Sequence, residues 1–188
     1  CKLAEDDDEN DYFFIIDEIN RGNLSKIFGE LFMLIEKDKR GIELQLLYSD
    51  ENFSVPPNVY IIGMMNTADR SLAMLDYALR RRFSFFTMKP GFNAPGFQAY
   101  QDSLKSDDFN KLIACVKQLN SKIAEDISLG EGFCIGHSYF CSLTPETANT
   151  QTLSSIVEYE LIPLLKEYWF DEPAKIVDWS DRLRSAVK

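Results

Sequence analysis

Two short apolar runs, each ending on polar side chains, constrain the fold of this chain more than any other feature. Residues 13–16 ("FFII") run into Asp17 and Glu18, and residues 58–66 ("NVYIIGMMN") end on Asn66. Four bulky apolar residues in succession are typical of a strand buried on both faces of a parallel sheet. Ligands bind such sheets outside the carboxyl ends of the strands, so the three polar residues are predicted to face one binding site.

The residues around these runs predict an alternation of strands and helices. Apolar residues recur at helical spacing from Leu24 to Ile35, and Gly41 follows as a helix stop. The other predicted elements are strands at 12–16, 58–66 and 83–88, a hairpin of 42–48 with 53–55, and a short helix at 73–80. Strands that alternate with helices are typical of a parallel sheet with crossover helices, so we expect an α/β fold over residues 12–90.

A different pattern begins after residue 90. Two stripes of apolar residues at helical spacing lie within 109–123 and 153–168, and Pro163 is predicted to kink the second. We therefore expect residues 91–188 to form an all-α subdomain. Residues 1–11 ("CKLAEDDDEND") are strongly acidic and are predicted to form a solvated loop.

Composition narrows the classes of function. The chain has 188 residues and a formal net charge of −10, which argues against a large nucleic-acid-binding face. No apolar stretch approaches the roughly 20 residues that cross a bilayer. The four cysteines form no Cys-x-x-Cys pair, which is typical of free thiols in a reducing compartment, so we expect a cytoplasmic location without a membrane. His137 is the only histidine, which excludes a multi-histidine zinc site.

The string "FFIIDE" resembles the Walker B motif of nucleotide-hydrolysing motors. In that motif Asp17 would hold Mg²⁺ through water, and Glu18 would orient and polarise the attacking water. A strand end would fix both carboxylates beside the phosphates. Apolar runs followed by Asp-Glu are also common by chance, so this motif alone leaves the function open.

The string "MMNTADRS" (64–71) has two readings. Asn66 leaves a buried strand at the same sheet edge, where AAA+ ATPases keep a polar sensor that positions the lytic water. Alternatively, Asn66 and Thr67 cap the next helix, and Asp69 with Arg70 forms a surface pair.

The string "LDYALRRRF" (75–83) places three arginines at the end of a predicted helix. Positive charge at a helix C-terminus is favourable, so a solvated basic cap is one interpretation. The other is an arginine finger that reaches the γ-phosphate held by the neighbouring subunit of a ring.

Together, in this order and spacing, the three motifs resemble the AAA+ motor of McrB-type proteins, the GTP-using subunits of modification-dependent restriction systems. The resemblance is dense over residues 12–90 and thins to a lid-like region around "GEGFCIGHSYF" (130–140). It implies that Asp17 and Glu18 are the Walker B pair and that Asn66 is sensor 1.

The resemblance also implies roles for other residues. Arg81 is the first candidate for the finger and Arg82 the second. Asn20 and Arg21 would face the nucleotide or the adjoining subunit, and Asp69 and Arg70 belong to the signature after the sensor. His137 would contact the nucleotide side of the lid, or it is simply hydrogen-bonded structure.

The phosphate-binding motif G-x-x-x-x-G-K-[ST] (Walker A) does not occur in the sequence. The expected fold is therefore a partial AAA+ P-loop NTPase core, lacking its first strand and Walker A, followed by an all-α lid. We expect a C-terminal fragment that does not bind nucleotide tightly or hydrolyse it alone.

For the full-length protein, the resemblance implies hydrolysis of GTP (or ATP) with Mg²⁺ in a ring, expected to be a hexamer. The motor would serve restriction of DNA that carries 5-methylcytosine. A separate McrC-like nuclease subunit would cut, and DNA would be bound by domains outside these residues. Two alternatives remain: a MoxR-like ATPase that remodels protein partners, and an assembly module that hydrolyses nothing.

Overall fold

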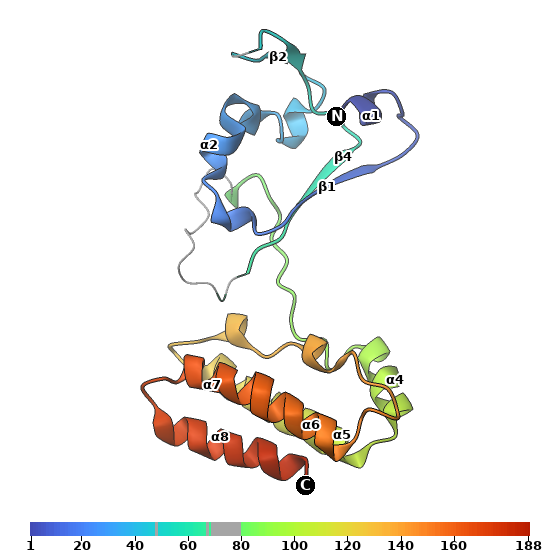
Figure 1. Cartoon of the computed structure of the whole chain (residues 1–188). Coiled ribbons are helices and arrows are strands. Elements are labelled where there is room, and N and C mark those ends of the chain that lie inside the picture. Colours follow the sequence, from blue (N-terminus) through green and yellow to red (C-terminus); the bar gives the residue numbers. More distant parts are fainter. Residues whose placement is uncertain (48, 67, 69–79) are drawn as a thin grey trace. The chain divides into compact units, whose positions relative to one another are not determined.

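The computed structural model describes residues 1–47, 49–66, 68 and 80–188, and every structural statement below refers to these residues. The chain divides into two compact units, Cys1–Phe86 and Thr87–Lys188 (Figure 1). The first is α/β and the second is all-α, so the predicted combination of a partial α/β core and a helical lid is confirmed. The predicted bounds of 12–90 and 91–188 stay predictions.

A parallel pair of strands forms the centre of the first unit. Strand β1 (Tyr12–Ile16) pairs with β4 (Val59–Gly63), with Tyr12 opposite Val59 and Ile16 opposite Gly63. The two strands predicted from apolar runs are therefore confirmed, and they are parallel as expected. Both run toward the polar residues that follow them in the sequence.

One face of this pair is covered only in part, with Phe14 on it 55% exposed, and the other face is exposed, so the prediction of burial on both faces is wrong. Side chains alternate between the two faces of a strand. On the covered face, Ile16 and Ile61 pack against the cluster of Ile19, Phe32 and Ile35. The opposite face consists of paired apolar side chains that remain exposed: Phe13, Ile15, Tyr60 and Ile62.

The helix predicted from Leu24 to Gly41 is broken into shorter pieces. These are α2 (Leu24–Phe28), the 3₁₀ turn η2 (Gly29–Met33) and the 3₁₀ turn η3 (Lys37–Lys39). Gly29 has a φ of +50°, a left-handed conformation that ends α-helices. The glycine therefore stops the α-helix although the apolar spacing continues beyond it.

Smaller elements complete the first unit. The predicted hairpin is confirmed in a shorter form as the antiparallel pair β2 (Leu44–Gln45) and β3 (Asn52–Phe53). A short helix α1 (Lys2–Glu5) lies within the predicted acidic loop. A 3₁₀ turn η1 (Ile19–Arg21) follows β1.

The third strand, predicted at 83–88, is wrong because these residues form no strand. Phe85, Phe86 and Met88 have the apolar character of a strand but are exposed. A strand also needs a neighbour that takes up its backbone hydrogen bonds, and sequence pattern does not supply one. The helix predicted at 73–80 lies outside the described residues except for Arg80.

The second unit is a helical bundle with one continuous core. Its elements are α4 (Pro95–Leu104), α5 (Asp107–Glu125), η4 (Glu131–Phe133), η5 (His137–Phe140), α6 (Thr150–Ile156), η6 (Val157–Leu161), α7 (Ile162–Tyr168) and α8 (Pro173–Ala186). Both predicted apolar stripes are helical, and the stripe on α5 is buried from Phe109 to Ile123. The long helix around Pro163 widens into a π-helical turn at η6. The wider turn suits a proline, which has no backbone N–H to donate to the preceding turn.

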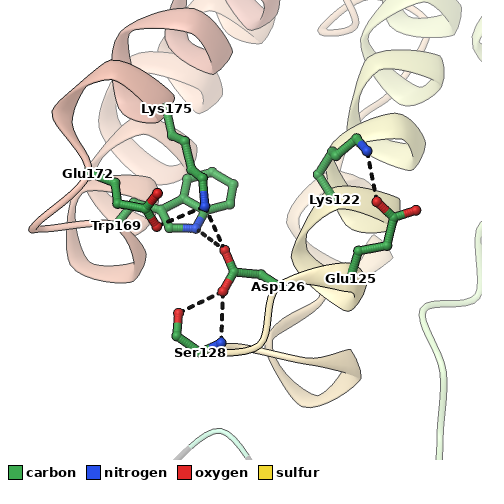
Figure 2. Close-up of polar contacts among 7 residues, drawn as sticks. All are labelled: Lys122, Glu125, Asp126, Ser128, Trp169, Glu172 and Lys175. Atoms are coloured by element: carbon green, nitrogen blue, oxygen red, sulfur yellow. Dashed lines mark hydrogen bonds and ion pairs between the residues drawn. The ribbon is translucent and has the colours of Figure 1, made fainter.

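A buried carboxylate joins three segments of this bundle (Figure 2). Asp126 directly follows α5, and its side chain is 9% exposed. The hydroxyl and backbone N–H of Ser128 donate to one carboxylate oxygen at 2.7 and 2.8 Å. The Trp169 ring N–H and the Lys175 ammonium donate to the other at 2.9 and 3.0 Å. These bonds, Ser128 first, hold the pKa of Asp126 well below its usual value.

No helix among the described residues is long and apolar enough to cross a membrane.

Candidate functional site

The two parallel strands end side by side, so the polar residues that follow them lie at one edge of the sheet. The backbone N–H of Met64 donates to the carbonyl of Ile16 at 2.9 Å, and that of Ile19 donates to the carbonyl of Met64 at 2.9 Å. Pairing thus continues one step beyond the strands. Asp17 and Glu18 leave one strand where residues 64–66 leave the other, as the sequence predicted for parallel strands.

Gly63 permits a close approach at this edge. A Cβ at position 63 would lie 2.5 Å from Cδ1 of Ile19. Ile19 is buried in the cluster beneath the sheet, so a larger residue would displace it. Because Ile19 directly follows Glu18, this packing also fixes the backbone of the second carboxylate.

Glu18 has an unusual backbone conformation. Its φ of +50° and ψ of +45° are left-handed, which costs a residue other than glycine about 1–3 kcal/mol. Its N–H donates to Oδ1 of Asp17 at 2.9 Å, and its Oε2 pairs with Nε of Arg21 at 2.8 Å. Strain of this kind clusters at functional sites, and here it turns the chain sharply between the two carboxylates.

Asn20 is buried next to this turn and is 9% exposed. Its Oδ1 accepts no hydrogen bond from any residue that the structure describes. A buried acceptor without a partner is costly and usually has a reason, such as a ligand that donates to it. Asn20 and Arg21 thus lie beside the carboxylates, one buried and one exposed.

Asn66 lies at the end of the second run and is exposed. Its Oδ1 accepts from the backbone N–H of Ala68 at 3.0 Å, the local bond by which Asn initiates a turn. This geometry accommodates both the capping and the sensor interpretation. Asp69 and Arg70, which the resemblance assigned to the signature, lie outside the described residues.

The three arginines have different surroundings. The guanidinium of Arg80 lies 5.9 Å from the centroid of Phe85, and Arg81 is exposed. Arg82 instead pairs with Glu36 and is largely buried. This partner was not predicted, because Glu36 occurs in a charged run, "EKDKRG", that is typical of a solvated helix end.

His137 belongs to the second unit and is fixed within it. Its Nδ1 accepts from the backbone N–H of Gly91 at 3.0 Å, which places the proton of the neutral ring on Nε2. The ring meets Phe92 and Phe97 edge to face. A Cβ at position 91 would come within 3.0 Å of the ring, so glycine permits this contact. Packing and hydrogen bonding within the lid account for this histidine, and its contact with nucleotide stays a prediction.

The residues at the sheet edge fit a magnesium ion bound together with phosphates. Mg²⁺ typically takes one or two protein carboxylates and completes its shell with water and substrate oxygens. Asp17 supplies one exposed carboxylate at a strand end. Among the described residues no cluster of three or more His, Cys, Asp or Glu side chains forms a protein-only metal cage. Asp17 would hold the ion, and the orphaned Oδ1 of Asn20 marks where a donor is needed.

Two family models match this chain, and together they define its class. Residues 5–83 match the AAA domain of the dynein-related subfamily, so the first unit is part of an AAA domain. Residues 111–177 match the alpha-helical lid domain of McrB. The chain is therefore of McrB type, with part of an AAA core followed by a McrB lid.

Two curated relatives agree with this assignment. The EcoKMcrB subunit of a type IV methyl-directed restriction enzyme from Escherichia coli (strain K12) is 51% identical over 193 residues. The match covers 97% of this chain and 42% of that protein. The YdiS component of the type II restriction enzyme BsuMI from Bacillus subtilis (strain 168) is 29% identical over 143 residues, covering 65% of this chain and 42% of that protein. Neither relative is matched over even half of its length.

Proposed function

We propose that this chain is part of a nucleotide-hydrolysing ring motor that serves DNA restriction. The observation that carries the proposal is the sheet edge, where the strained Asp17–Glu18 turn and Asn66 leave two parallel strands side by side. Such an edge is where α/β proteins of this kind bind and cleave nucleotides. The 51% identity to a restriction subunit supports the biological setting.

Each residue at the edge has a chemical task in this proposal. Asp17 would hold the Mg²⁺ that accompanies the nucleotide, and this ion would supply positive charge beside the phosphates. Glu18 orients the attacking water and accepts its proton through the carboxylate that now pairs with Arg21. Asn66 positions the same water, and Asn20 offers its buried oxygen to a donor at the site. Arg81, exposed in the middle of the arginine run, serves the neighbouring subunit.

The finer parts of the proposal follow from the resemblance. GTP is the preferred nucleotide, and six subunits form the ring. A separate McrC-like nuclease subunit cuts DNA that carries 5-methylcytosine, and parts of the protein outside these residues bind that DNA. The setting is the cytoplasm. The sequence of the chain lacks a Walker A motif, so the 188 residues alone neither bind GTP tightly nor hydrolyse it.

The decisive variant is Glu18→Gln in the longer protein. Glutamine preserves the shape of the side chain but cannot accept the proton of water, so hydrolysis should fall about 10²- to 10⁴-fold. Nucleotide binding and ring assembly should be retained. GTP turnover, fluorescent-nucleotide binding and sedimentation measure the three properties.

A matched control is Glu9→Gln, which removes the same charge from the exposed acidic segment. Its turnover should equal that of the unmodified protein. Near-normal turnover of Glu18→Gln would show that Glu18 is not the activating carboxylate and would overturn the proposal.

A further inference from the structure

Arg82 is held inside the first unit, unlike the arginines before it. Its Nη2 lies 2.5 Å from Oε1 of Glu36, and its side chain is only 8% exposed. Its guanidinium carbon lies 4.4 Å from the centroid of the Phe32 ring, within the range of a cation–π contact. Arg81, its immediate neighbour, is exposed. Adjacent arginines therefore point into different environments.

The partners of Arg82 belong to the segment that follows the Walker B strand. Phe32 is part of η2, and Glu36 lies just beyond it. Phe83, next to Arg82, packs against the cluster of Ile19, Phe32 and Ile35. Ile19 in turn directly follows Glu18. The same small core thus anchors the residue after the activating carboxylate and the residues after Arg81.

This geometry is unsuited to a residue that must leave its place to contact a phosphate. If Arg82 left its place, Glu36 would lose its partner at a position that is only 29% exposed, which is costly for a partly buried charge. The stacking on Phe32 would be lost as well. Arg81 carries neither cost, because its side chain is exposed.

We propose that Arg82 is a positioning residue: its pair with Glu36 fixes the backbone that carries Arg81, so that Arg81 is presented to the neighbouring subunit. The inference rests on the proposed function, in which Arg81 acts in trans. It also assigns Glu36 a role that the charged run around it does not suggest. Loss of the pair should misplace Arg81 rather than remove it.

The size of the effect distinguishes the two arginines. Arg81→Ala removes the finger itself and should lower turnover about 10³- to 10⁵-fold. Misplacing a catalytic group by about 1 Å can cost on the order of 10²-fold, so Arg82→Ala and Glu36→Gln should lower kcat by about that factor. KM for GTP should change little in both, because the subunit's own nucleotide contacts are intact.

Mixed rings test whether the defect acts in trans. Arg82→Ala subunits mixed with Glu18→Gln subunits should recover activity, because an intact Glu18 then meets a correctly presented Arg81. The double variant Arg82→Ala with Glu18→Gln, mixed with unmodified subunits, should not raise turnover above that of the unmodified subunits alone. If Arg82→Ala subunits stay inactive in every co-assembled mixture, Arg82 merely supports its own subunit and the inference is overturned.

A charge exchange tests whether Arg82 acts through its pair. Arg82→Glu combined with Glu36→Arg should recover more activity than either single variant, since the ion pair is restored with its sense reversed. If the exchange recovers nothing and Glu36→Gln is normal while Arg82→Ala is inactive, Arg82 contacts the reacting groups itself. That result would also overturn the inference.

A structural control separates loss of stability from misplacement. Arg40 is a half-buried arginine of the same unit, and its Nη1 donates to the carbonyl of Val59 at 2.9 Å. Arg40→Ala should lower the melting temperature without recovery in mixed rings. Failure of the proposed function has a different signature: the Glu18→Gln or Arg81→Ala variant would then hydrolyse GTP at a normal rate. Normal turnover of Arg82→Ala and Glu36→Gln beside inactive Arg81→Ala would overturn only the positioning role.

Discussion

The two units of this chain bury their apolar residues to very different degrees. In the lid one continuous core includes Phe109, Phe140 and Trp169, which are almost fully buried. In the AAA unit the described buried residues form two small clusters, while Phe13 and Ile15 of the central strand are 62% and 58% exposed. The described residues of the lid enclose one continuous apolar core, whereas one face of the described AAA strands is exposed. We therefore expect the lid to be the more stable of the two units, although the candidate site lies in the AAA unit.

Separating the two units tests this difference in packing most directly. Residues 87–188 alone should fold cooperatively, because their core is enclosed within the unit. Residues 1–86 alone should not, because the exposed sheet face leaves too little burial to offset chain entropy. Circular dichroism melts of the two fragments measure this difference. A cooperative melt of 1–86, with no lid melt above it, would reverse the comparison.

Sequence pattern predicted the two units unequally for the same physical reason. The stripe from Phe109 to Ile123 is a local signal, because a helix forms its own backbone hydrogen bonds and only needs a core to cover one face. The strands were also found, and their shared direction correctly placed Asp17, Glu18 and Asn66 at one edge. The strand expected at 83–88 was wrong, because a strand is stable only beside another strand.

Sequence periodicity does not predict the other features of the site. The pairing of Arg82 with Glu36 joins residues far apart in sequence, and each reads locally as a solvated charge. The left-handed conformation of Glu18 and the close packing of Ile19 against Gly63 appear only in the folded backbone. The break at Gly29 did have a signal, the glycine itself, but the apolar spacing on both sides outweighed it.

A pair of matched truncations makes the comparison quantitative. Phe109→Ala in the lid should lower the free energy of unfolding of that unit by about 3–5 kcal/mol, because the cavity forms in a closed core. Phe13→Ala on the bare sheet face should change stability by no more than about 0.5 kcal/mol, as is usual for exposed positions. Urea melts of the whole chain measure both changes. A large cost for Phe13→Ala would show that its face is covered in solution.

An effect smaller than that of Phe109→Ala is expected at Asp126, the charged link between three segments of the lid (Figure 2). Asp126→Asn keeps the size of the side chain but replaces one acceptor oxygen by a donor that faces the Trp169 N–H or Ser128. Hydrogen bonds to charged groups contribute about 1.5–3 kcal/mol each, so a loss of about that size is expected near neutral pH. The melting temperature of residues 87–188 with and without the substitution measures it.

The pH dependence of that difference identifies the charge as its source. Because the folded-state pKa of Asp126 is depressed, its contribution is fully present above the unfolded pKa of about 3.9 and is lost as the pH falls through the folded value. The two melting temperatures should therefore differ most from pH 5 to 8 and converge below about pH 4. A Ser128→Ala control, which removes the hydroxyl but retains the carboxylate, should shift the melting temperature less. A difference that stays constant down to pH 2 would mean that Asp126 acts by shape, and that the lid owes its stability to the apolar core alone.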